Sequence, residues 1–511
     1  RNKKERARNI ELEQLQAEME QVSTISEPKS MKELFSALYE AGELWREENK
    51  EIKEITRGDR KGEIEEKIPV PAIEDVAKAL RKYCHFTFIG IGRTTDKSPL
   101  YVFDYDTGLY SDSADLFNQL CHTFDTRVHP KTWDSIKKVV RLKTKMRPTF
   151  SDPTLIPVNN GVVNLETKKL MPFSPDYVIT AKISTDYQVN PVKPLFDGKF
   201  DFDNWLSEIA CHDNEVITLL WQIMNEAINP NHTRGKMAIL YGEGNNGKGT
   251  FQGLLINLIG LSNVSALKPD QFMEKFKLSS LIGKVCNIGD DISSKYLDEV
   301  SDLMSIVTGD TITIEEKHLP SYEVSLKLFC LFSGNALPNA RNKSQGWYRR
   351  LCIVPFNADF NGSKEIPEIK NIYLKDRQLL EWVLWKIINI EPFEKFIEPA
   401  VVTKTLDNYK KDNDFVLSWV VDVYIPSRWN EFSKFPLFLA KEKLEEYLRD
   451  SGIDHANMYG FGNRLISHLS SMDEATFTLK VGRLNAEEVA VFDDVFNKDR
   501  LKKSQRLIIR E

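Results

Sequence analysis

The sequence predicts an α/β protein, and three observations lead to that prediction. Residues 234–360 alternate apolar, strand-like runs with helical stretches, the pattern of a parallel sheet covered by helices. One of these runs, "MAIL", leads into the glycine-rich stretch "YGEGNNGKGT" and then into the helical stretch "FQGLLINLIG". No apolar run approaches the roughly 20 residues that span a bilayer, so the regular elements are expected to belong to globular domains with no membrane contact.

We divide the chain by these patterns into six segments. They are a charged helical segment and linker (1–71), an α+β domain (72–195), a helical collar or linker (196–233), the α/β core (234–360), a helical lid and connector (361–430) and a winged-helix-like C-terminal domain (431–511). In the first segment, Leu12, Leu15, Met19 and Val22 form an apolar helical stripe. The stripe fits either one surface helix or a short oligomerising coil.

The elements of the second and third segments follow from local patterns. "AIEDVAKALRKYC" is helical, while "HFTFIGIG" and "PLYVFDYDTGLY" read as strands, the latter closing in an Asp-Thr-Gly turn. "LIPVNNGVVNLETKKLMPF" alternates apolar positions around an Asn-Gly turn, which predicts a hairpin. "FDNWLSEIACHDNEVITLLWQIMNEAI" (202–228) is a strong helical stretch.

Composition limits the setting and the partners. Apolar residues make up 41% and charged residues 28%, as in ordinary globular proteins. The net charge is −6, so contacts with nucleic acid require local basic patches. The six cysteines form no CxxC pair, which indicates a reducing, cytoplasmic setting and no zinc site. The chain opens with Arg1 and shows no secretory signal, which indicates a fragment or a processed form.

The stretch "YGEGNNGKGT" has the order of a phosphate-binding loop: strand, glycine-rich turn, helix. Gly242, Gly244 and Gly247 allow backbone N–H groups to approach an anion, and Lys248 adds a positive charge for the β- and γ-phosphates. The expected nucleotide is ATP with Mg²⁺. The predicted contacts are Gly242, Gly244, Asn245, Asn246, Gly247, Lys248, Gly249 and Thr250.

One position of this loop departs from the common GxxxxGK[ST] pattern. Gly249 stands where a serine or threonine would hold Mg²⁺. Thr250 could take that role, or the metal could be held by acidic residues and water alone. The sequence leaves both possibilities open.

Two polar groups follow later strands. "KVCNIGDDIS" runs from a short apolar strand into Asp290 and Asp291, of which one suits Mg²⁺ binding and the other the activation of a water molecule. "LKLFCLFSGNALPN" ends an apolar strand at Asn335, whose amide could orient that water. A solvated turn is the alternative for the acidic pair, and turn chemistry is the alternative for the asparagine.

Two further motifs lie in the core. "GWYRRLCIVPF" places two arginines before a strand, either as a surface ion-pairing site or as a charge for the nucleotide of a neighbouring subunit. "GDTITIEEKHLPSYEVSLK" predicts a β-hairpin with Lys317 and His318 at its tip, where they could grip a nucleic-acid phosphate.

The order of these motifs within residues 242–350 resembles the superfamily 3 helicases, an AAA+ group of viruses, phages and mobile elements. The family loop often reads GxxxxNGK, as Asn246-Gly247-Lys248 does here. By this resemblance Asp290 and Asp291 form the Walker B element, Asn335 is sensor 1 and Arg350 is the arginine finger. "EKHL" (316–319) looks like the DNA-gripping hairpin of polyomavirus large T antigen, which implies translocation contacts for Lys317 and His318.

The flanks extend the resemblance to roughly residues 72–425. "IPVNNGVVNLETKKLMPFSPDYVIT" is similar to the N-terminal region of poxvirus-type primase-helicases of phages and plasmids, and "LDNYKKDNDFVLSWV" to the segment after their core. The resemblance implies a hexameric ATPase ring on single-stranded and forked DNA in a bacterial cytoplasm, with a primase or initiation partner. We expect no primase activity here, because the chain shows neither a zinc ribbon nor a polymerase acid cluster.

The alternatives are of two kinds. A non-helicase AAA+ protein, such as an origin-binding loader or a defence ATPase, would carry the same motifs. Nucleoside monophosphate kinases also have "GKGT", but near the start of a smaller domain and without the hairpin. Two basic runs, "IKKVVRLKTKMR" (136–147) and "NKDRLKKSQRLIIR" (497–510), fit either solvated charge or, in the second run, a winged-helix wing on DNA.

Overall fold

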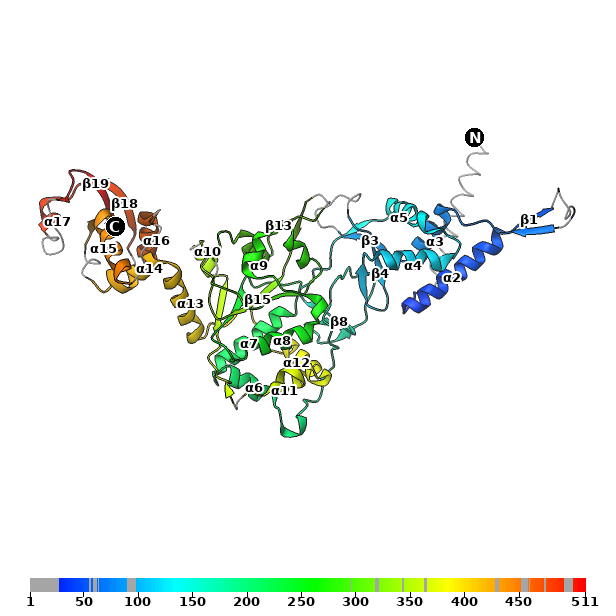
Figure 1. The fold of residues 1–511 in the computed structure, drawn as a ribbon, viewed down its shortest axis with the longest axis horizontal. Helices are drawn as coiled ribbons and strands as arrows, with labels where there is room; N and C mark the ends of the chain where they lie inside the picture. Colours follow the sequence, from blue (N-terminus) through cyan, green and yellow to red (C-terminus); the bar gives the residue numbers. More distant parts are fainter. Residues whose placement is uncertain are drawn as a thin grey trace.

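The structure is a computed structural model of residues 1–511, and it divides into three bodies along the chain (Figure 1). It describes residues 27–54, 57, 62, 64–89, 98–294, 296–317, 321–341, 344–362, 365–427, 432–451, 458, 460–472, 475–490 and 500–511. The predicted stripe of Leu12, Leu15, Met19 and Val22 lies outside the described residues, as does His318. None of the helices in the described residues is long and apolar enough to cross a membrane.

The N-terminal body mixes helices and small sheets, as the α+β pattern predicts. A four-helix cluster (α2–α5) covers the sheet β5-β4-β3-β6. A second sheet, of β7, β8 and β9, buries Ile156, Val158 and Val163 in the core of the central body and so joins the two bodies. The predicted Asp-Thr-Gly turn joins β4 to β5. The bounds are α2 Met31–Glu48, β1 Glu51–Glu54, β2 Ile64–Lys67, α3 Ile73–Tyr83, β3 Phe86–Ile89, β4 Tyr101–Asp104, β5 Leu109–Ser111, α4 Ala114–Phe124, α5 Trp133–Leu142, β6 Met146–Arg147, β7 Leu155–Val158, β8 Gly161–Asn164 and β9 Leu170–Met171.

The central body is built on a five-stranded sheet in the order β11-β12-β15-β10-β16, in which every neighbouring pair is parallel. All carboxyl ends therefore meet at one edge of the sheet. The bounds are α6 Phe202–Ile209, α7 Asn214–Ala227, β10 Met237–Tyr241, α8 Lys248–Ile259, β11 Val264–Ser265, β12 Cys286–Gly289, α9 Ser301–Thr308, β13 Thr311–Ile314, β14 Tyr322–Ser325, β15 Phe329–Gly334, α10 Gln345–Tyr348, β16 Leu351–Pro355, α11 Pro367–Asn371, α12 Arg377–Ile388 and α13 Ala400–Asn413.

Alternate residues of the strands pack into two different cores, which makes three layers. Ala238 and Leu240 of β10 join the cluster with α6, α7, α8 and α12. Met237 and Ile239 face the other way, toward α9 and the β13–β14 hairpin. In Figure 1 the first group of helices lies below the sheet and the second group above it. The buried strands read as nearly continuous apolar runs because both faces are covered.

The predicted helical stretch 202–228 is two helices. Cys211 and His212 have positive φ angles of 51° and 63°, which no α-helix accommodates, and Asp213 then caps α7 through the amides of Glu215 and Val216. Both helices share one apolar cluster with α8 and the sheet. The segment that the sequence suggested as a collar or linker therefore packs as part of the central body.

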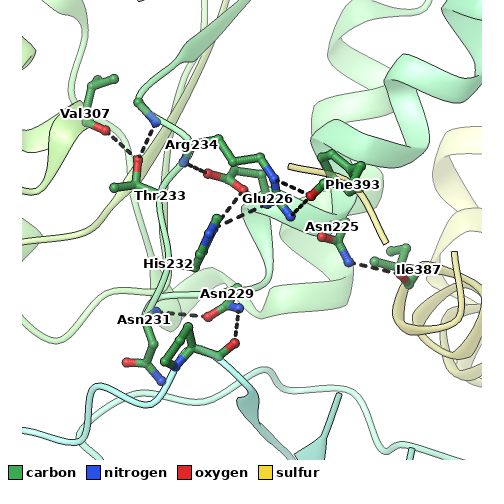
Figure 2. Close-up of polar contacts among 12 residues, drawn as sticks. Asn225, Glu226, Asn229, Asn231, His232, Thr233, Arg234, Val307, Ile387 and Phe393 are labelled. Atoms are coloured by element: carbon green, nitrogen blue, oxygen red, sulfur yellow. Dashed lines mark hydrogen bonds and ion pairs between the residues drawn. The ribbon is translucent and has the colours of Figure 1, made fainter. Parts of the chain in front are cut away.

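A buried polar cluster fixes the entry to β10, the strand that carries the phosphate loop (Figure 2). The carboxylate of Glu226, 1% exposed, accepts hydrogen bonds from Arg234, including one from its backbone amide at 2.6 Å. Arg234 also donates to the carbonyl of Phe393. Burial alone would raise the pKa of Glu226, but His232 and Arg234 outweigh it and lower that pKa.

The same segment ties the central body to its neighbours. The side chain of Asn229 donates to the Pro153 carbonyl of the N-terminal body, and Thr233 donates to the Val307 carbonyl at the end of α9 (Figure 2). Residues 225–235 thus fix the position of β10 relative to α7, α9 and the N-terminal body.

The C-terminal body follows α13 and has its own apolar cluster. Two helices and then two antiparallel strands appear as the sequence predicts, and the sheet order is β17-β19-β18. The winged-helix assignment stays a prediction. The bounds are α14 Phe415–Trp419, β17 Lys434–Pro436, α15 Leu437–Asp450, α16 Phe461–Met472, β18 Phe477–Gly482, α17 Ala486–Ala490 and β19 Gln505–Arg510.

Candidate active site

The predicted phosphate loop lies between β10 and α8, as the sequence indicates. Gly247 has a φ of 90° and Asn245 a φ of 52°, so the loop uses left-handed backbone at two positions. The helix α8 begins at Lys248, directly after the second of them. The first amides of a helix lack internal partners, which makes this end of α8 suited to an anion.

Lys248 is folded onto its own loop. Its ammonium lies 2.8 Å from the Gly242 carbonyl, 2.7 Å from the Glu243 carbonyl and 3.0 Å from the side-chain oxygen of Asn246. The residue is 8% exposed; burial lowers the pKa of this amine, and the nearby charge of Asp290 partly opposes that effect. The positive charge is thus held in the loop by neutral oxygens, and a phosphate would displace at least one of them.

Asn246 fastens the loop to the end of β16. Its side-chain nitrogen donates to the Phe356 carbonyl at 2.7 Å, and the residue is 4% exposed. Gly242 lies against the same carbonyl: a Cβ there would come within 2.3 Å of it. The segment after β16 adds a further contact, from the Phe360 amide to the Asn245 carbonyl at 2.9 Å.

Gly249 occupies open space. A Cβ added there would meet no atom within 4 Å, and its φ is not left-handed. The glycine is therefore not required by packing or by backbone geometry. Thr250, the third residue of α8, is half-buried.

The predicted acidic pair and asparagine lie at the same edge of the sheet as the loop. Asp290 and Asp291 follow β12, Asn335 follows β15, and β15 pairs with both β12 and β10. All three side chains are exposed. Gly334 pairs with Tyr241 and accepts a hydrogen bond from the Gly242 amide at 3.3 Å, so Asn335 lies beside the start of the loop.

Two residues that the sequence reasoning missed join this group. The hydroxyl of Ser333 on β15 bonds to the carboxylate of Asp290 and lies 3.0 Å from the side-chain oxygen of Gln252 on α8. Both are buried. Their positions in the sequence could have predicted that they lie near the site. Gln252 lies one helical turn after Lys248, and Ser333 is two residues before Asn335.

The predicted arginine finger lies elsewhere. Arg350 directly precedes β16, so it is at the amino edge of the sheet, opposite the phosphate loop. It is 8% exposed and donates to the Gly346 carbonyl at 2.5 Å, while Arg349 is exposed. A role for Arg350 in a neighbour's site stays a prediction, but the geometry makes Arg349 the arginine that is free to reach outward.

The β-hairpin of residues 309–327 is confirmed. The strands β13 and β14 pair antiparallel from Thr311↔Ser325 to Ile314↔Tyr322, and alternate residues bury against the central body. Lys317 is exposed at the tip. Glu316 accepts a hydrogen bond from Tyr322 at 2.8 Å, which turns this acidic side chain back onto the hairpin.

The donor set suits a nucleotide phosphate and a magnesium ion. A buried cationic amine, a glycine-rich turn and a helix start provide for the anion. Among the described residues no group of three His, Cys, Asp or Glu side chains could enclose a metal. Asp290 and Thr250 stay the predicted side-chain ligands of a hard cation, whose shell oxygens from a nucleotide and water would complete.

Two models of protein families match this chain, one over its N-terminal part and one over the core that contains the phosphate loop. A family model described as "D5 N terminal like" matches residues 31–211, and one described as "Family of unknown function (DUF5906)" matches residues 240–350. No curated protein matches the chain. The first match overlaps residues 72–195, for which the sequence resembles the N-terminal region of poxvirus-type primase-helicases, and it supports that part of the prediction.

Solved structures add only distant likeness. The chain is similar to "The A form apo structure of NrS-1 C terminal region-CTR", at 13% identity and a TM-score of 0.48, over 85% of this chain and 99% of that chain. A second form, "The apo structure of NrS-1 C terminal region", has 13% identity and a TM-score of 0.47, over 85% and 98%. The family matches give the clearer statement: a D5 N terminal like region precedes a region similar to a family of unknown function, and the latter contains every predicted residue of the nucleotide site.

Proposed function

We propose that this chain is an ATP-driven DNA helicase of superfamily 3 that acts in phage or mobile-element replication. One observation carries the proposal. Lys248, Asp290, Asp291 and Asn335 come from three adjacent parallel strands or the loops after them, and they lie at one edge of the sheet. Ligands of open α/β sheets bind at that edge. The D5 N terminal like match and the hairpin with Lys317 are further support.

Each residue has a separate task in this proposal. The loop amides and Lys248 bind the phosphates, and Asp290, with or without Thr250, binds Mg²⁺. Asp291 takes a proton from the attacking water, and the Asn335 amide orients that water toward the terminal phosphate. ATP and Mg²⁺ supply the reactive phosphate and the charge that stabilises its transfer.

The hairpin and the arginines would connect hydrolysis to DNA. A hexameric ring places Lys317 and His318 toward single-stranded or forked DNA, and contacts to backbone phosphates make the grip independent of sequence and sensitive to salt. An arginine before β16 then serves the nucleotide of the neighbouring subunit. A primase or an initiation protein is the expected partner in replication.

The test is magnesium-dependent ATP hydrolysis, measured with and without single-stranded DNA. The wild-type protein is expected to hydrolyse ATP faster when DNA is added, and Lys248→Ala is expected to lose hydrolysis by at least about 100-fold, because it removes the charge on the phosphates. Lys236→Ala is the matched control: it changes a lysine just before β10, at the opposite end of that strand. Hydrolysis that persists in Lys248→Ala would overturn the assignment of the site.

A further inference from the structure

We infer that Ser333 and Gln252 are positioning residues that hold the carboxylate of Asp290 for the metal. The inference rests on the proposed function, since it assigns Asp290 to Mg²⁺. It adds two residues to which neither the motif pattern nor the family matches give a role.

The contacts around Asp290 come from three different elements. Ser333, on β15, donates its hydroxyl to Oδ1 of Asp290, and the backbone amide of Asp291 donates to the same oxygen at 2.8 Å. Gln252, on α8, lies 3.0 Å from the Ser333 hydroxyl and donates to the Gly289 carbonyl at 3.3 Å. Strand β15 thus contacts the carboxylate directly, and helix α8 reaches it through Ser333 and through the last residue of β12, Gly289.

The two supporting side chains, Ser333 and Gln252, are buried, while the carboxylate of Asp290 that they support is exposed. Ser333 is 1% exposed and Gln252 is 2% exposed, whereas Asp290 is exposed. Buried polar groups that are hydrogen-bonded keep one geometry, because leaving either unpaired costs free energy. The exposed carboxylate is therefore held from beneath by Ser333, and Gln252 in turn contacts the Ser333 hydroxyl.

Both hydrogen bonds described for this carboxylate end on Oδ1. Oδ2 thus keeps its lone pairs for a ligand at the surface. Magnesium demands near-octahedral geometry with short bonds, so it is sensitive to the direction in which a carboxylate points. Groups that orient a metal ligand in this manner affect metal affinity by about 10- to 100-fold in other proteins.

Ser333 has one proton and two acceptors within reach, Asp290 and the Gln252 oxygen. Only one of them takes the proton at a time. Whichever acceptor takes the proton, the hydroxyl stays paired, so Ser333 keeps its position beneath Asp290. Because Gln252 belongs to α8, the helix that begins with Lys248, the hydrogen bond of Ser333 to Gln252 also connects β15 to that helix.

The experiment uses the full chain and a fluorescent, non-hydrolysable ATP analogue. The measured quantity is the Mg²⁺ concentration that gives half-maximal binding of the analogue. Ser333→Ala is expected to raise it by about tenfold, in line with the effect of groups that orient metal ligands. Gln252→Leu keeps the volume of the side chain and is expected to shift it in the same direction. Steady-state hydrolysis should show a loss in kcat larger than the change in KM for ATP.

Ser265→Ala is the matched control. Ser265 is also a buried serine of the same sheet, and it bonds to Asn287 at 2.9 Å, away from Asp290. The control is expected to lower the melting temperature as Ser333→Ala does but to leave the Mg²⁺ requirement unchanged. Equal Mg²⁺ curves for wild type, Ser333→Ala and Gln252→Leu would overturn the inference.

The same experiment separates this inference from the proposed function. If wild-type protein binds the analogue and Lys248→Ala does not, the nucleotide site stands whatever Ser333→Ala does. If wild type does not bind the analogue at all, the proposed function fails first. Should Ser333→Ala not fold, the result for Gln252→Leu decides.

Discussion

The ammonium of Lys248 lies 3.0 Å from the side-chain oxygen of Asn246, while the nitrogen of the same amide donates to the Phe356 carbonyl at 2.7 Å. Asn246 therefore positions the lysine of the phosphate loop against the end of β16. Neither partner of Asn246 follows from the loop motif alone, since Phe356 lies more than one hundred residues later in the chain.

The first prediction concerns this amide. Asn246→Ala is expected to weaken binding of an ATP analogue by about tenfold, because a hydrogen bond to a charged group contributes about 1.5–3 kcal/mol. Asn246→Asp is expected to weaken it further, since a carboxylate would hold the ammonium away from phosphate. Asn225→Ala is the control, because it also removes an amide that donates to a distant carbonyl, that of Ile387, but lies away from the phosphate loop. Tight binding by Asn246→Asp would contradict this role.

The glycines of the loop are predicted to differ in tolerance. Gly242→Ala is expected to destabilise the protein by about 1–3 kcal/mol and to weaken nucleotide binding, because the new Cβ would lie 2.3 Å from the Phe356 oxygen. Gly249→Ser is expected to leave the melting temperature unchanged, since its Cβ meets no atom within 4 Å. Thermal melts and analogue titrations of both variants test the pair. If both variants changed the melting temperature and analogue binding equally, Gly242 would not lie against the Phe356 carbonyl as described.

Substitutions of the two arginines before β16 are predicted to have different effects: one lowers the stability of the protein and the other lowers its activity. Arg350→Ala is expected to lower the melting temperature, because the buried guanidinium packs near Gly346 and bonds to its carbonyl. Arg349→Ala is expected to keep the melting temperature and to lose hydrolysis in the assembled protein. The opposite result, a stable but inactive Arg350→Ala and an active Arg349→Ala, would assign the arginine finger to Arg350, as the resemblance implies.

A pH dependence is predicted at the joint between the central and C-terminal bodies. Asp414, between α13 and α14, is 1% exposed and bonds to Arg464 and His468 of α16. Burial alone would raise its pKa, but the hydrogen bonds and charges of His468 and Arg464 lower the pKa of Asp414 to about 2. A carboxyl with a lowered folded-state pKa stabilises the protein above its ordinary pKa and loses that effect as pH falls toward 2.

The check is the unfolding free energy of wild type and Asp414→Asn as a function of pH. The difference in unfolding free energy between wild type and Asp414→Asn is expected to be about 2 kcal/mol at pH 6. It is expected to shrink between pH 4 and pH 2, as the wild-type carboxyl becomes protonated. Asp412→Asn, an exposed neighbour, should show no such gap. A gap that stays constant down to pH 2 would show that Asp414 does not titrate in this range.

Local sequence patterns were sufficient to predict the regular elements of the core and to place the predicted site residues after the strands that precede them. The strand–turn–helix order at 237–259 and the alternation around Lys317 predicted β10, α8 and the β13–β14 hairpin. The acidic pair and Asn335 were predicted to lie near the loop because polar residues directly follow buried strands, and the parallel order brings such strand ends to one edge.

What the sequence did not predict depends on contacts between distant segments. The break between α6 and α7 arises from left-handed backbone at Cys211 and His212, which are not glycines. Ser333 and Gln252 are ordinary buried polar residues until β15 and α8 are placed beside Asp290. Whether Arg349 or Arg350 is buried depends on how α10 packs, and the periodicity of the sequence does not indicate it.

Unwinding of a forked DNA duplex in the presence of ATP and Mg²⁺ shows directly whether this chain is a helicase. We expect wild-type protein to separate the strands and Lys248→Ala to leave them paired. Lys317→Ala is expected to retain basal hydrolysis but to lose unwinding and stimulation by DNA, and Lys370→Ala, also exposed, is the control. Hydrolysis of ATP by the wild-type protein without any strand separation would contradict the claim.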